Sequence, residues 1–317
     1  MTESKTLKTV GEDAAIAALQ SIAGKARDAV IGSGDDCAVV PVEGGTHDWL
    51  LTSDPVVEGI HFDADTDPRL VGRKAVGRVF SDIAAMGGEP VWLLINVTAP
   101  ESCTLEWLRT VYRGARSLCR KYGAQIIGGD TGKGPIRALH VFGVGRVPRG
   151  DALRRSGARP GDAIYVTGRL GGSRAGGHLK FEPRIEQGLW LREQGWPSAL
   201  MDVSDGVATD LRRLLTINRV GAELDVEAIP VSPAVRRLND DGQAPWMHAL
   251  TDGEDFELLF TVSPARCALF ESSWKDTFRL RCTRIGAITA TRNVLKLREA
   301  DGEVRTWEAH GFEHFRR

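Results

Sequence analysis

The stretch Ile31-Gly-Ser-Gly-Asp-Asp-Cys-Ala-Val-Val40 places two adjacent aspartates between small, flexible residues and an apolar run. An apolar run of this kind is typical of a buried strand, so the two carboxylates are expected at the end of that strand. Adjacent carboxylates repel each other unless solvent, a cationic side chain or a metal ion compensates their charge. This stretch therefore predicts an acidic position at the edge of a hydrophobic core.

The same arrangement, an apolar run that leads into an aspartate, recurs along the chain. The recurrences end at Asp54, Asp82, Asp130, Asp202 and Asp252. Taken alone, each of these aspartates is also compatible with a solvated turn or a helix N-cap; Asp202 and Asp205 could simply cap a helix that begins near Gly206. Recurrence favours carboxylates that converge on Mg²⁺ and phosphate. Several carboxylates would repel a polyphosphate unless cations bridged them, so more than one Mg²⁺ per site is expected.

Length and composition exclude several classes of protein. The chain has 317 residues, enough for two domains or one large one, and a formal net charge of −1. This charge predicts no strong attraction to nucleic acid or to an anionic membrane. The first nine residues lack the apolar segment of a signal peptide, and no apolar run approaches the roughly 20 residues of a membrane span. The five cysteines are scattered, which favours reduced thiols in a cytoplasmic protein.

Hydrophobic periodicity predicts helices and strands mixed in both halves of the chain, which indicates an α/β or α+β fold. Helices are expected at residues 12–26, 67–86, 104–122, 183–193, 206–215 and 264–274. Strands are expected at residues 38–40, 48–53, 91–97, 125–127, 137–147, 163–167, 221–226, 256–262 and 282–288. Glycine, proline and charge gather at residues 148–162, which predicts domains at 1–148 and 149–317.

The common nucleotide-binding loops are absent from this sequence. Gly129-Asp-Thr-Gly-Lys-Gly134 fails the Walker A pattern at two points, because Ile127 stands where its first glycine belongs and Gly134 follows the lysine. Gly32-Ser-Gly34 is followed by Asp-Asp-Cys, so a dinucleotide-binding glycine motif is also absent. A nucleotide would have to be bound through metal ions and other contacts.

Other candidate site residues have a structural alternative. Thr52 and Ser53 offer hydroxyl or backbone oxygens to the cation at Asp54, but they could be plain strand-end hydroxyls. His61 could bind a ligand or be structural. Arg155 could bind phosphate in a bidentate fashion or lie in a solvated basic turn.

Two further segments have the same ambiguity. The glycine-rich segment 168–177 could approach a phosphate through its amides or be a flexible loop. The acids of Thr251-Asp-Gly-Glu-Asp255 could face a cationic ligand or metal, or form an ordinary turn.

Taken in order, these motifs resemble the thiamine-monophosphate kinases, a family within the AIR-synthase-like superfamily. The motifs that carry the resemblance are Gly34-Asp-Asp-Cys-Ala38, Thr52-Ser-Asp54, Val57-Glu-Gly-Ile-His-Phe62, Ser81-Asp-Ile-Ala-Ala-Met-Gly87, Gly128-Gly-Asp-Thr131, Ala152-Leu-Arg-Arg-Ser-Gly-Ala-Arg-Pro-Gly-Asp162, Tyr165-Val-Thr-Gly168, Met201-Asp-Val-Ser-Asp-Gly206, Gly253-Glu-Asp-Phe-Glu-Leu-Leu-Phe260 and Gly311-Phe-Glu-His-Phe315. They cover nearly the whole chain.

The resemblance implies a two-domain AIR-synthase-like fold and a homodimer. The N-terminal domains would pair their sheets across the dimer, and a C-terminal α/β domain would pack beside each. The implied reaction is the ATP-dependent, Mg²⁺-assisted phosphorylation of thiamine monophosphate to thiamine diphosphate. Phosphoryl transfer needs positioning and charge neutralisation, and an ionised phosphate acceptor needs no general base.

The resemblance also implies a role for each matching residue. The implied Mg²⁺ ligands are Asp36, Thr52, Ser53, Asp54, Asp82, Asp130, Asp202 and Asp205, of which Asp54, Asp82 and Asp130 are central to catalysis. The implied nucleotide contacts are Gly129, Asp130, Arg155 and Ser204. The implied contacts to thiamine monophosphate are His61, Glu254 and Phe312.

The chain departs from the family pattern at Val79, Gly132, Asp252 and Ala309. The family usually has asparagine at the first of these positions, threonine at the second, glycine at the third and an aromatic residue at the last, which Trp307 or Phe312 could replace. These departures motivate one alternative, an AIR-synthase-like ATP-dependent kinase or synthase that acts on a different small phosphorylated acceptor. A second alternative is a degenerate protein that binds nucleotide or dimerises without turnover.

Overall fold

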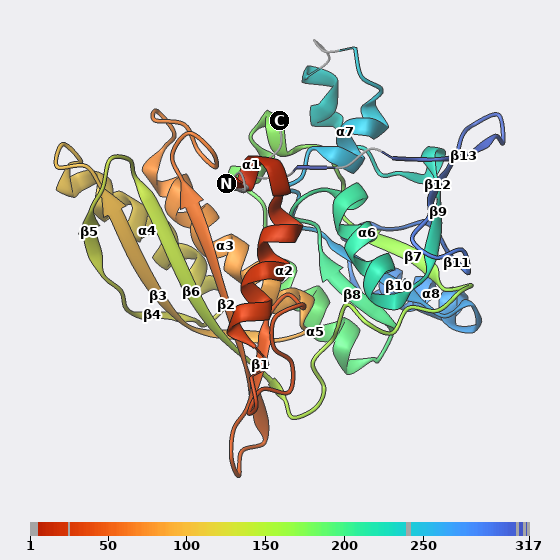
Figure 1. Ribbon diagram of the computed structural model, residues 1–317, viewed down its shortest axis with the longest axis horizontal. Coiled ribbons are helices and arrows are strands. Elements are labelled where there is room, and N and C mark those ends of the chain that lie inside the picture. The colour runs from red at the N-terminus through yellow and green to blue at the C-terminus, as the bar shows by residue number, and fades with distance from the viewer. Residues whose placement is uncertain (1–5, 25, 239–241, 309–310, 313–314, 316–317) are drawn as a thin grey trace, which may run out of the picture.

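The computed structural model describes residues 6–24, 26–238, 242–308, 311–312 and 315. Within these residues the strands form two mixed sheets, one of six strands and one of seven, with helices packed against them (Figure 1). The first sheet lies between residues 38 and 148, the N-terminal half, and the second between residues 163 and 306, the C-terminal half. The mixed α/β class predicted from the sequence is confirmed.

The first sheet has the order β1-β2-β6-β3-β4, with β5 paired to β3. Its strands are β1 Ala38–Pro41, β2 His47–Val57, β3 Glu89–Ala99, β4 Gln125–Gly128, β5 Thr131–Lys133 and β6 Ala138–Pro148. The long strands β2, β6 and β3 pair antiparallel, with Asp54 opposite Val141 and Val141 opposite Ile95. One face of this sheet buries residues such as Leu93 and Ile95 against helices. The other face stays accessible at Trp92 and Leu94, 37% and 39% exposed.

Two capped helices cover the buried face of the first sheet. Helix α3 (Pro68–Ala85) begins after Asp67, whose carboxylate accepts the Arg69 N–H, and proline occupies its first turn. Helix α4 (Leu105–Lys121) begins after Thr104, whose hydroxyl accepts a backbone N–H. The sequence predicted both caps correctly.

Helices α3 and α4 approach each other closely at two glycines. A Cβ atom on Gly72 would lie 1.9 Å from the Val111 carbonyl oxygen, and one on Gly114 would lie 1.9 Å from the Arg69 carbonyl oxygen. Neither position has room for a side chain, so the two glycines set the distance between the helices and hold α3 in place for the site described below.

The second sheet has the order β13-β12-β9-β11-β7-β10-β8. Its strands are β7 Ala163–Thr167, β8 Ala199–Asp202, β9 Gly221–Asp225, β10 Leu258–Val262, β11 Cys282–Thr289, β12 Leu295–Arg298 and β13 Val304–Thr306. The α-helices of this half are α5 Ile185–Glu193, α6 Val207–Asn218, α7 Pro245–Thr251 and α8 Cys267–Thr277. All five residues of the central strand β7 are buried. Its side chains alternate between two hydrophobic clusters, with Ile164 in one and Tyr165 in the other.

One hydrophobic cluster continues from the N-terminal half into the C-terminal half. It contains residues of α3 such as Phe80 and residues of the second sheet such as Tyr165 and Phe260. Helix α5 approaches α3 so closely that a Cβ atom on Gly188 would lie 2.1 Å from the Ala84 carbonyl oxygen. The two halves therefore share a packed core. The domain division at 148/149 stays a prediction.

Most predicted elements are present with ends shifted by a few residues, and some predictions were wrong. The helix predicted to reach residue 26 ends at Ala23, as α2 (Glu12–Ala23). The strand predicted from residue 256 begins only at Leu258, because Phe256 has a φ of 51°, which no strand residue adopts. The predicted helix 264–274 is a 3₁₀ turn, Pro264–Arg266, followed by α8. Helices and strands that the sequence analysis did not predict are α1 (Leu7–Val10), α7, β5, β8, β12 and β13.

The predictions about cysteines and membrane spans can also be compared with the structure. The five cysteines are free thiols, three of them buried. Within the described ranges, the helices are too short or too polar to cross a membrane.

Candidate active site

A cavity of about 880 Å³ lies between the two halves of the molecule. From the N-terminal half it is lined by Asp36, Thr52, Ser53, Asp54, Arg78 and Asp82. From the C-terminal half it is lined by Arg155, Asp202, Ser204, Asp205, Arg213 and Phe256, among others. The cavity thus gathers most of the acids that the sequence analysis selected.

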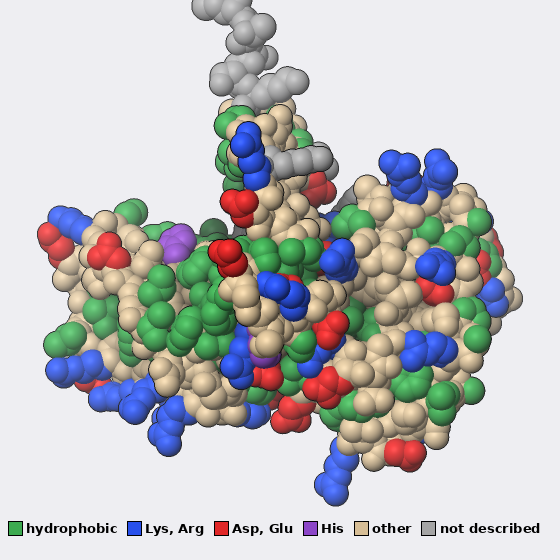
Figure 2. All heavy atoms as spheres, turned by 90° about the horizontal axis from the view of Figure 1, so that it is seen from below, with side chains coloured by type: hydrophobic (Ala, Val, Ile, Leu, Met, Phe, Trp, Pro, Cys, Tyr) green, Lys and Arg blue, Asp and Glu red, His purple; other side chains and the backbone are tan. Residues whose placement is uncertain are grey.

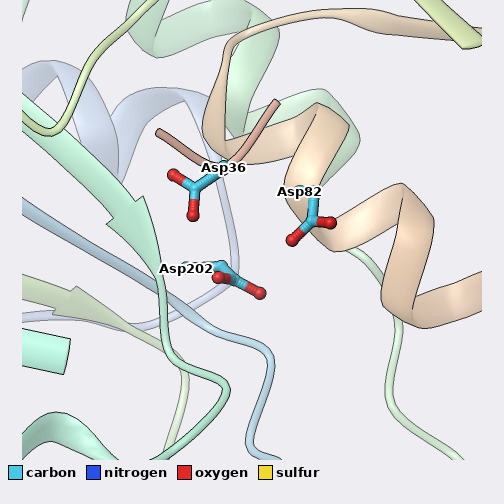
Figure 3. A group of neighbouring side chains, drawn as sticks. All are labelled: Asp36, Asp82 and Asp202. Atoms are coloured by element: carbon cyan, nitrogen blue, oxygen red, sulfur yellow. The ribbon is translucent and has the colours of Figure 1, made fainter. Parts of the chain in front are cut away.

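Three aspartates from distant parts of the chain meet in this cavity (Figure 3). Asp36 lies two residues before the start of β1, Asp82 lies in the last turns of α3, and Asp202 ends β8. One carboxylate oxygen from each lies within 4.8 Å of the other two. The structure therefore brings together three of the predicted metal ligands.

Burial and repulsion from neighbouring carboxylates raise the pKa of two of these aspartates, Asp82 and Asp202. Burial, followed by repulsion from Asp54, raises the pKa of Asp82 well above its usual range. Burial, followed by repulsion from Asp36, raises the pKa of Asp202 to about 7. Such shifts are characteristic of functional sites where a bound cation offsets the repulsion.

Two hydroxyl groups fix the orientation of these carboxylates. Thr52 donates a hydrogen bond to Asp82 Oδ2 at 2.5 Å, and Ser81 donates one to Asp202 Oδ2 at 2.6 Å. Hydrogen bonds of this kind favour the ionised form. They also leave the second oxygen of each carboxylate available to another ligand.

Asp36 has one oxygen paired and one without a partner. Arg155 Nη2 lies 2.5 Å from Asp36 Oδ1, and although burial acts to lower the pKa of Arg155, attraction to Asp36 prevails and raises it. Within the described residues, the buried Asp36 Oδ2 accepts no hydrogen bond. A buried oxygen of this kind is costly unless a ligand compensates it. Three converging hard oxygen donors, one of them unsatisfied, fit Mg²⁺.

Asp54 lies beside the triad and pairs with a cation of α3. Arg78 Nη2 is 2.9 Å from Asp54 Oδ1, and Arg78 Nη1 is 3.2 Å from Glu254 Oε1. Lys74, Arg78 and Asp82 follow one another at intervals of four, so they share one face of α3. This face carries two cations and one acid, of which Arg78 and Asp82 line the cavity.

Lys74 is fully buried and donates to three acceptors. Its Nζ lies 2.6 Å from the His61 carbonyl oxygen, 2.7 Å from His178 Nδ1 and 2.7 Å from Glu254 Oε1. Burial lowers the pKa of Lys74 to about 8, although Glu254 acts in the opposite direction. The His61 ring accepts the Val57 N–H through Nδ1 at 3.1 Å. Lys74 therefore joins His61 and Glu254, two of the residues that the resemblance predicted to contact thiamine monophosphate.

The backbone around Glu254 has an unusual conformation. Glu254 and Phe256 have φ values of 54° and 51°, the left-handed region that non-glycine residues seldom adopt. Their amides donate to the carbonyl oxygens of Ser204, at 2.6 Å, and Val203, at 2.8 Å. Conformations of this kind cost energy and persist where the surroundings impose them, often at binding sites.

The loop between β8 and α6 carries the predicted residues Ser204 and Asp205. Both backbone amides donate to Asp210 Oδ2, at 3.0 and 2.9 Å. Arg213 forms ion pairs with the carboxylates of Asp205 and Asp210. Asp210 thus orients this loop toward the cavity, and Asp205 is neutralised by Arg213 rather than placed in the triad.

Thr52, Ser53 and Asp54 follow one another on β2, and their side chains alternate. Thr52 and Asp54 contact residues of α3, whereas Ser53 projects from the opposite, exposed face. Only a backbone oxygen of Ser53 could reach a cation held beside the other two.

Gly129 and Asp130 are not brought into the cavity within this chain. Both are exposed and lie between β4 and β5, and neither is among the cavity-lining residues. Three strand spacings, from β2 through β6 and β3 to β5, separate Asp54 from Asp130, a distance of about 14 Å. Asp130 is therefore a predicted metal ligand that lies outside the cavity of its own chain.

The C-terminal aromatic residues take different positions. Trp307 is buried against Trp246, with ring centroids 6.0 Å apart. Phe312 is 43% exposed, and its amide donates to the Asp205 carbonyl oxygen at 2.9 Å. Phe312 is therefore tied to the backbone of the cavity-lining residue Asp205 without lining the cavity itself, whereas Trp307 belongs to the core. Ala309 lies outside the described residues.

Two of the other residues that depart from the family pattern, Val79 and Asp252, make contacts within the protein. Val79 is fully buried, and its side chain fills the space above Gly143. Asp252 lies 3.1 Å from His248 Nδ1. Neither is among the residues that line the cavity. Gly132 is exposed in β5.

The sequence analysis did not select Lys74, Arg78 and His178 as site residues. The four-residue spacing of Lys74, Arg78 and Asp82 on a predicted helix was a signal that could have found the first two. His178 follows the glycine-rich segment 168–177, which folds into two short 3₁₀ turns. No sequence pattern connects it with Lys74.

Comparison with known proteins identifies the class of protein to which this fold belongs. Residues 34–147 match the family AIR synthase related protein, N-terminal domain. A crystal structure of the hydrogenase maturation protein HypE shares the fold, with 21% identity, a TM-score of 0.68 and coverage of 82% of this chain and 88% of that one. The fold is thus that of the AIR synthase-related proteins.

Two full-length relatives define the family more closely. The thiamine-monophosphate kinase of Salmonella typhimurium is 38% identical over 312 residues, 91% of this chain and 93% of the relative, and that of Escherichia coli is 36% identical over 313 residues, 91% of this chain and 93% of the relative. A solved structure, AaThiL complexed with AMPPCP and TMP, is 30% identical with a TM-score of 0.85 and covers 99% of this chain and 100% of that one. This chain belongs to the thiamine-monophosphate kinase family and is therefore an enzyme.

Proposed function

We propose that this enzyme transfers the γ-phosphoryl group of ATP to thiamine monophosphate and releases thiamine diphosphate and ADP. The observation that carries the proposal is the buried triad of Asp36, Asp82 and Asp202 in a cavity between the halves. Full-length similarity to a protein solved with AMPPCP, an ATP analogue, and TMP supports it. An acceptor oxygen forms the new bond to the γ-phosphorus while the bond from that phosphorus to the β-phosphate oxygen breaks.

The chain's own residues supply binding and charge neutralisation for this reaction. Asp36, Asp54, Asp82 and Asp202 would hold Mg²⁺, with Thr52, the Ser53 backbone and Asp205 as further oxygen ligands. Mg²⁺ bound there supplies the positive charge that the transferring phosphoryl group requires. The acceptor phosphate is ionised near neutral pH, so the site needs no general base.

The nucleotide and the acceptor would contact different residues, and the acceptor contacts lie beyond the lining of the cavity, where Glu254 pairs with the lining residue Arg78. Arg155 and Ser204 would contact the nucleotide. His61, Glu254 and Phe312 would contact thiamine monophosphate, with the Glu254 carboxylate suited to its cationic thiazolium ring. Val79 fills the space above Gly143 and Asp252 pairs with His248, so each of these departures has a structural role in this chain.

We also infer a homodimer formed through the exposed face of the first sheet. Leu51, Val144 and Trp92 lie in one row across this face, because they are paired in register on β2, β6 and β3. Phe142 and Leu94 extend the next row. Hydrophobic side chains also gather on the N-terminal half of the surface in Figure 2. An apolar sheet face of this kind is typical of an interface.

A dimer of this kind would also account for Gly129 and Asp130. Both lie at the far edge of the same sheet, about 14 Å from Asp54 across three strand spacings. Pairing two such sheets face to face brings one chain's edge toward the other chain's cavity. We propose that Gly129 and Asp130 complete the nucleotide and metal site of the partner subunit.

The direct test is to incubate the purified protein with ATP, Mg²⁺ and thiamine monophosphate and to separate the products by chromatography. Equal amounts of thiamine diphosphate and ADP, both lost when EDTA is added, are expected. ADP without thiamine diphosphate would show that the acceptor is a different compound. Neither product, with ATP still bound, would favour a protein without turnover.

A further inference from the structure

The cavity must hold two anionic reactants next to several carboxylates, so each reactant needs a cationic partner. Arg155 lies at the Asp36 end of the cavity. Arg213 is engaged with Asp205 and Asp210. Arg212, which also lines the cavity, donates to the Trp307 carbonyl oxygen. The lining cation that pairs with Glu254 is Arg78, on helix α3. The position of Arg78 makes it a candidate for the acceptor side of the reaction.

The Arg78 guanidinium is held in one place. Its Nη2 lies 2.9 Å from Asp54 Oδ1 and its Nη1 lies 3.2 Å from Glu254 Oε1. The side chain is only 11% exposed, and its Cζ lies 5.7 Å from the centroid of the Phe256 ring. Such a preorganised guanidinium loses little conformational freedom when it binds a planar or tetrahedral anion.

The same guanidinium has an N–H group that no described residue accepts a hydrogen bond from. It has five N–H groups, and within the described residues Asp54 and Glu254 are the carboxylates that accept from it. The Nε–H is buried and has no acceptor in the part of the chain that the structure describes. A buried donor without an acceptor is costly unless a ligand supplies one.

We propose that Arg78 binds the phosphate group of the acceptor, between the carboxylates of Asp54 and Glu254. This inference rests on the proposed function and adds the residue that recognises the phosphorylated end of the acceptor. When Asp54 acts as a metal ligand, Arg78 loses that partner, and the freed N–H groups donate to the acceptor phosphate. Arg78 neither gains nor loses a proton in the transfer.

The competing explanation is that Arg78 is only a structural ion pair between β2 and the loop that carries Glu254. A structural pair would stabilise the fold and would affect all ligands of the site alike. A phosphate-binding residue would affect only ligands that carry the acceptor phosphate. The two roles therefore differ in which ligand loses affinity.

The first test compares Arg78→Gln with a matched control, Arg192→Gln. Arg192 is also largely buried, 9% exposed, but it pairs with Glu193 on α5 outside the cavity. For Arg78→Gln we expect the KM for thiamine monophosphate to rise about tenfold to hundredfold, with the KM for ATP changed less than about twofold. The control is expected to keep both constants. An equal rise in both constants for Arg78→Gln would overturn the proposal.

The second test measures binding by calorimetry with Mg²⁺ and without ATP, using thiamine monophosphate and thiamine. The wild-type protein is expected to prefer the phosphorylated compound, and Arg78→Gln is expected to lose that preference. Equal weakening of both ligands would make Arg78 structural. If the wild-type protein neither binds nor turns over thiamine monophosphate, the proposed function fails, and inorganic phosphate becomes the probe. Phosphate affinity lost in Arg78→Gln would then support the inference, and unchanged affinity would overturn it.

Discussion

Ser81 donates a 2.6 Å hydrogen bond to Asp202 and thereby joins helix α3 of the N-terminal half to strand β8 of the C-terminal half. Ser81 immediately precedes Asp82, so the same turn of α3 supplies one carboxylate and orients another. The triad is therefore assembled at the boundary between the halves. Any change in how α3 packs against the second sheet would alter the distances among its oxygens.

Asp82→Asn should separate catalysis from stability. The substitution keeps the shape of the side chain but removes the charge that compensates bound cations, so kcat should fall by at least about a thousandfold. The metal-free protein should melt at the same or a higher temperature. This is expected because burial and repulsion from Asp54 already disfavour the ionised carboxylate. Steady-state kinetics and calorimetric melting measure the two effects.

The control for this variant is Asp162→Asn, a buried aspartate outside the cavity. Asp162 accepts hydrogen bonds from the Arg159 amide, at 3.0 Å, and from the Ser198 hydroxyl, at 2.5 Å. Its substitution should lower the melting temperature and leave kcat unchanged. Turnover above about a tenth of the wild-type value in Asp82→Asn would rule out the metal assignment.

Stabilisation by Mg²⁺ should depend on pH. The folded-state pKa of Asp202 is raised to about 7 by burial and by Asp36, against an unfolded value of about 3.9. The folded state therefore binds this proton more tightly, and the resulting stability of the metal-free protein is lost as pH rises from about 4 through 7. Mg²⁺ has to displace the same proton, so it should raise the melting temperature more near pH 8 than near pH 5.5.

Thermal melting with and without Mg²⁺ at the two pH values measures this difference. In Asp202→Asn the pH dependence of the Mg²⁺ effect should diminish, because the titrating group is gone. An equal Mg²⁺ shift at both pH values in the wild-type protein would mean that the cation does not bind at the triad.

The sequence predicted the acids of the site better than its cations. Apolar runs with an aspartate at one end located Asp36, Asp82 and Asp202, because an apolar segment determines which residue stands at the edge of the core. Arg78 and Lys74 interrupt an otherwise apolar helix face, and their burial depends on carboxylates that lie far away in the sequence. Their spacing places them on one helix face with Asp82, but it does not identify the distant carboxylates that they pair with.

The same distinction holds for the backbone. Caps such as Asp67 were predictable because the capping interaction is local. The late start of β10 was not, since the positive φ of Phe256 reflects hydrogen bonds to the distant residue Val203. The close approach of α3 and α4 through Gly72 and Gly114 likewise depends on a contact between separate helices.

Lys74→Met should weaken both the fold and acceptor binding. Methionine has similar length but cannot donate to the His61 carbonyl oxygen or to the carboxylate of Glu254, so the free energy of unfolding should fall by about 2–3 kcal/mol. Urea unfolding with an unchanged m value measures this loss. The control, Lys121→Met, removes a half-exposed lysine paired with Glu182 and should cost at most about 1 kcal/mol. Equal losses in the two variants would contradict a central role for Lys74.

Mixing two inactive variants should show whether the site is shared between subunits. Asp82→Asn and Asp130→Asn are each expected to form inactive homodimers. If Asp130 serves the partner's cavity, a mixed dimer has one site with both substitutions and one intact site. Unfolding and refolding an equal mixture makes half of the dimers mixed, so about a quarter of wild-type turnover should return.

The mixing experiment distinguishes the shared site from the alternative in which a single chain supplies all ligands. In that alternative every site in a mixed dimer carries one substitution, and no turnover returns. A size measurement on the refolded mixture is the necessary control, and Leu94→Lys, on the exposed face of β3, should reduce both the dimer fraction and the recovered turnover. Recovery that survives loss of the dimer would contradict the shared site, because complementation by the partner's Asp130 requires contact between the subunits.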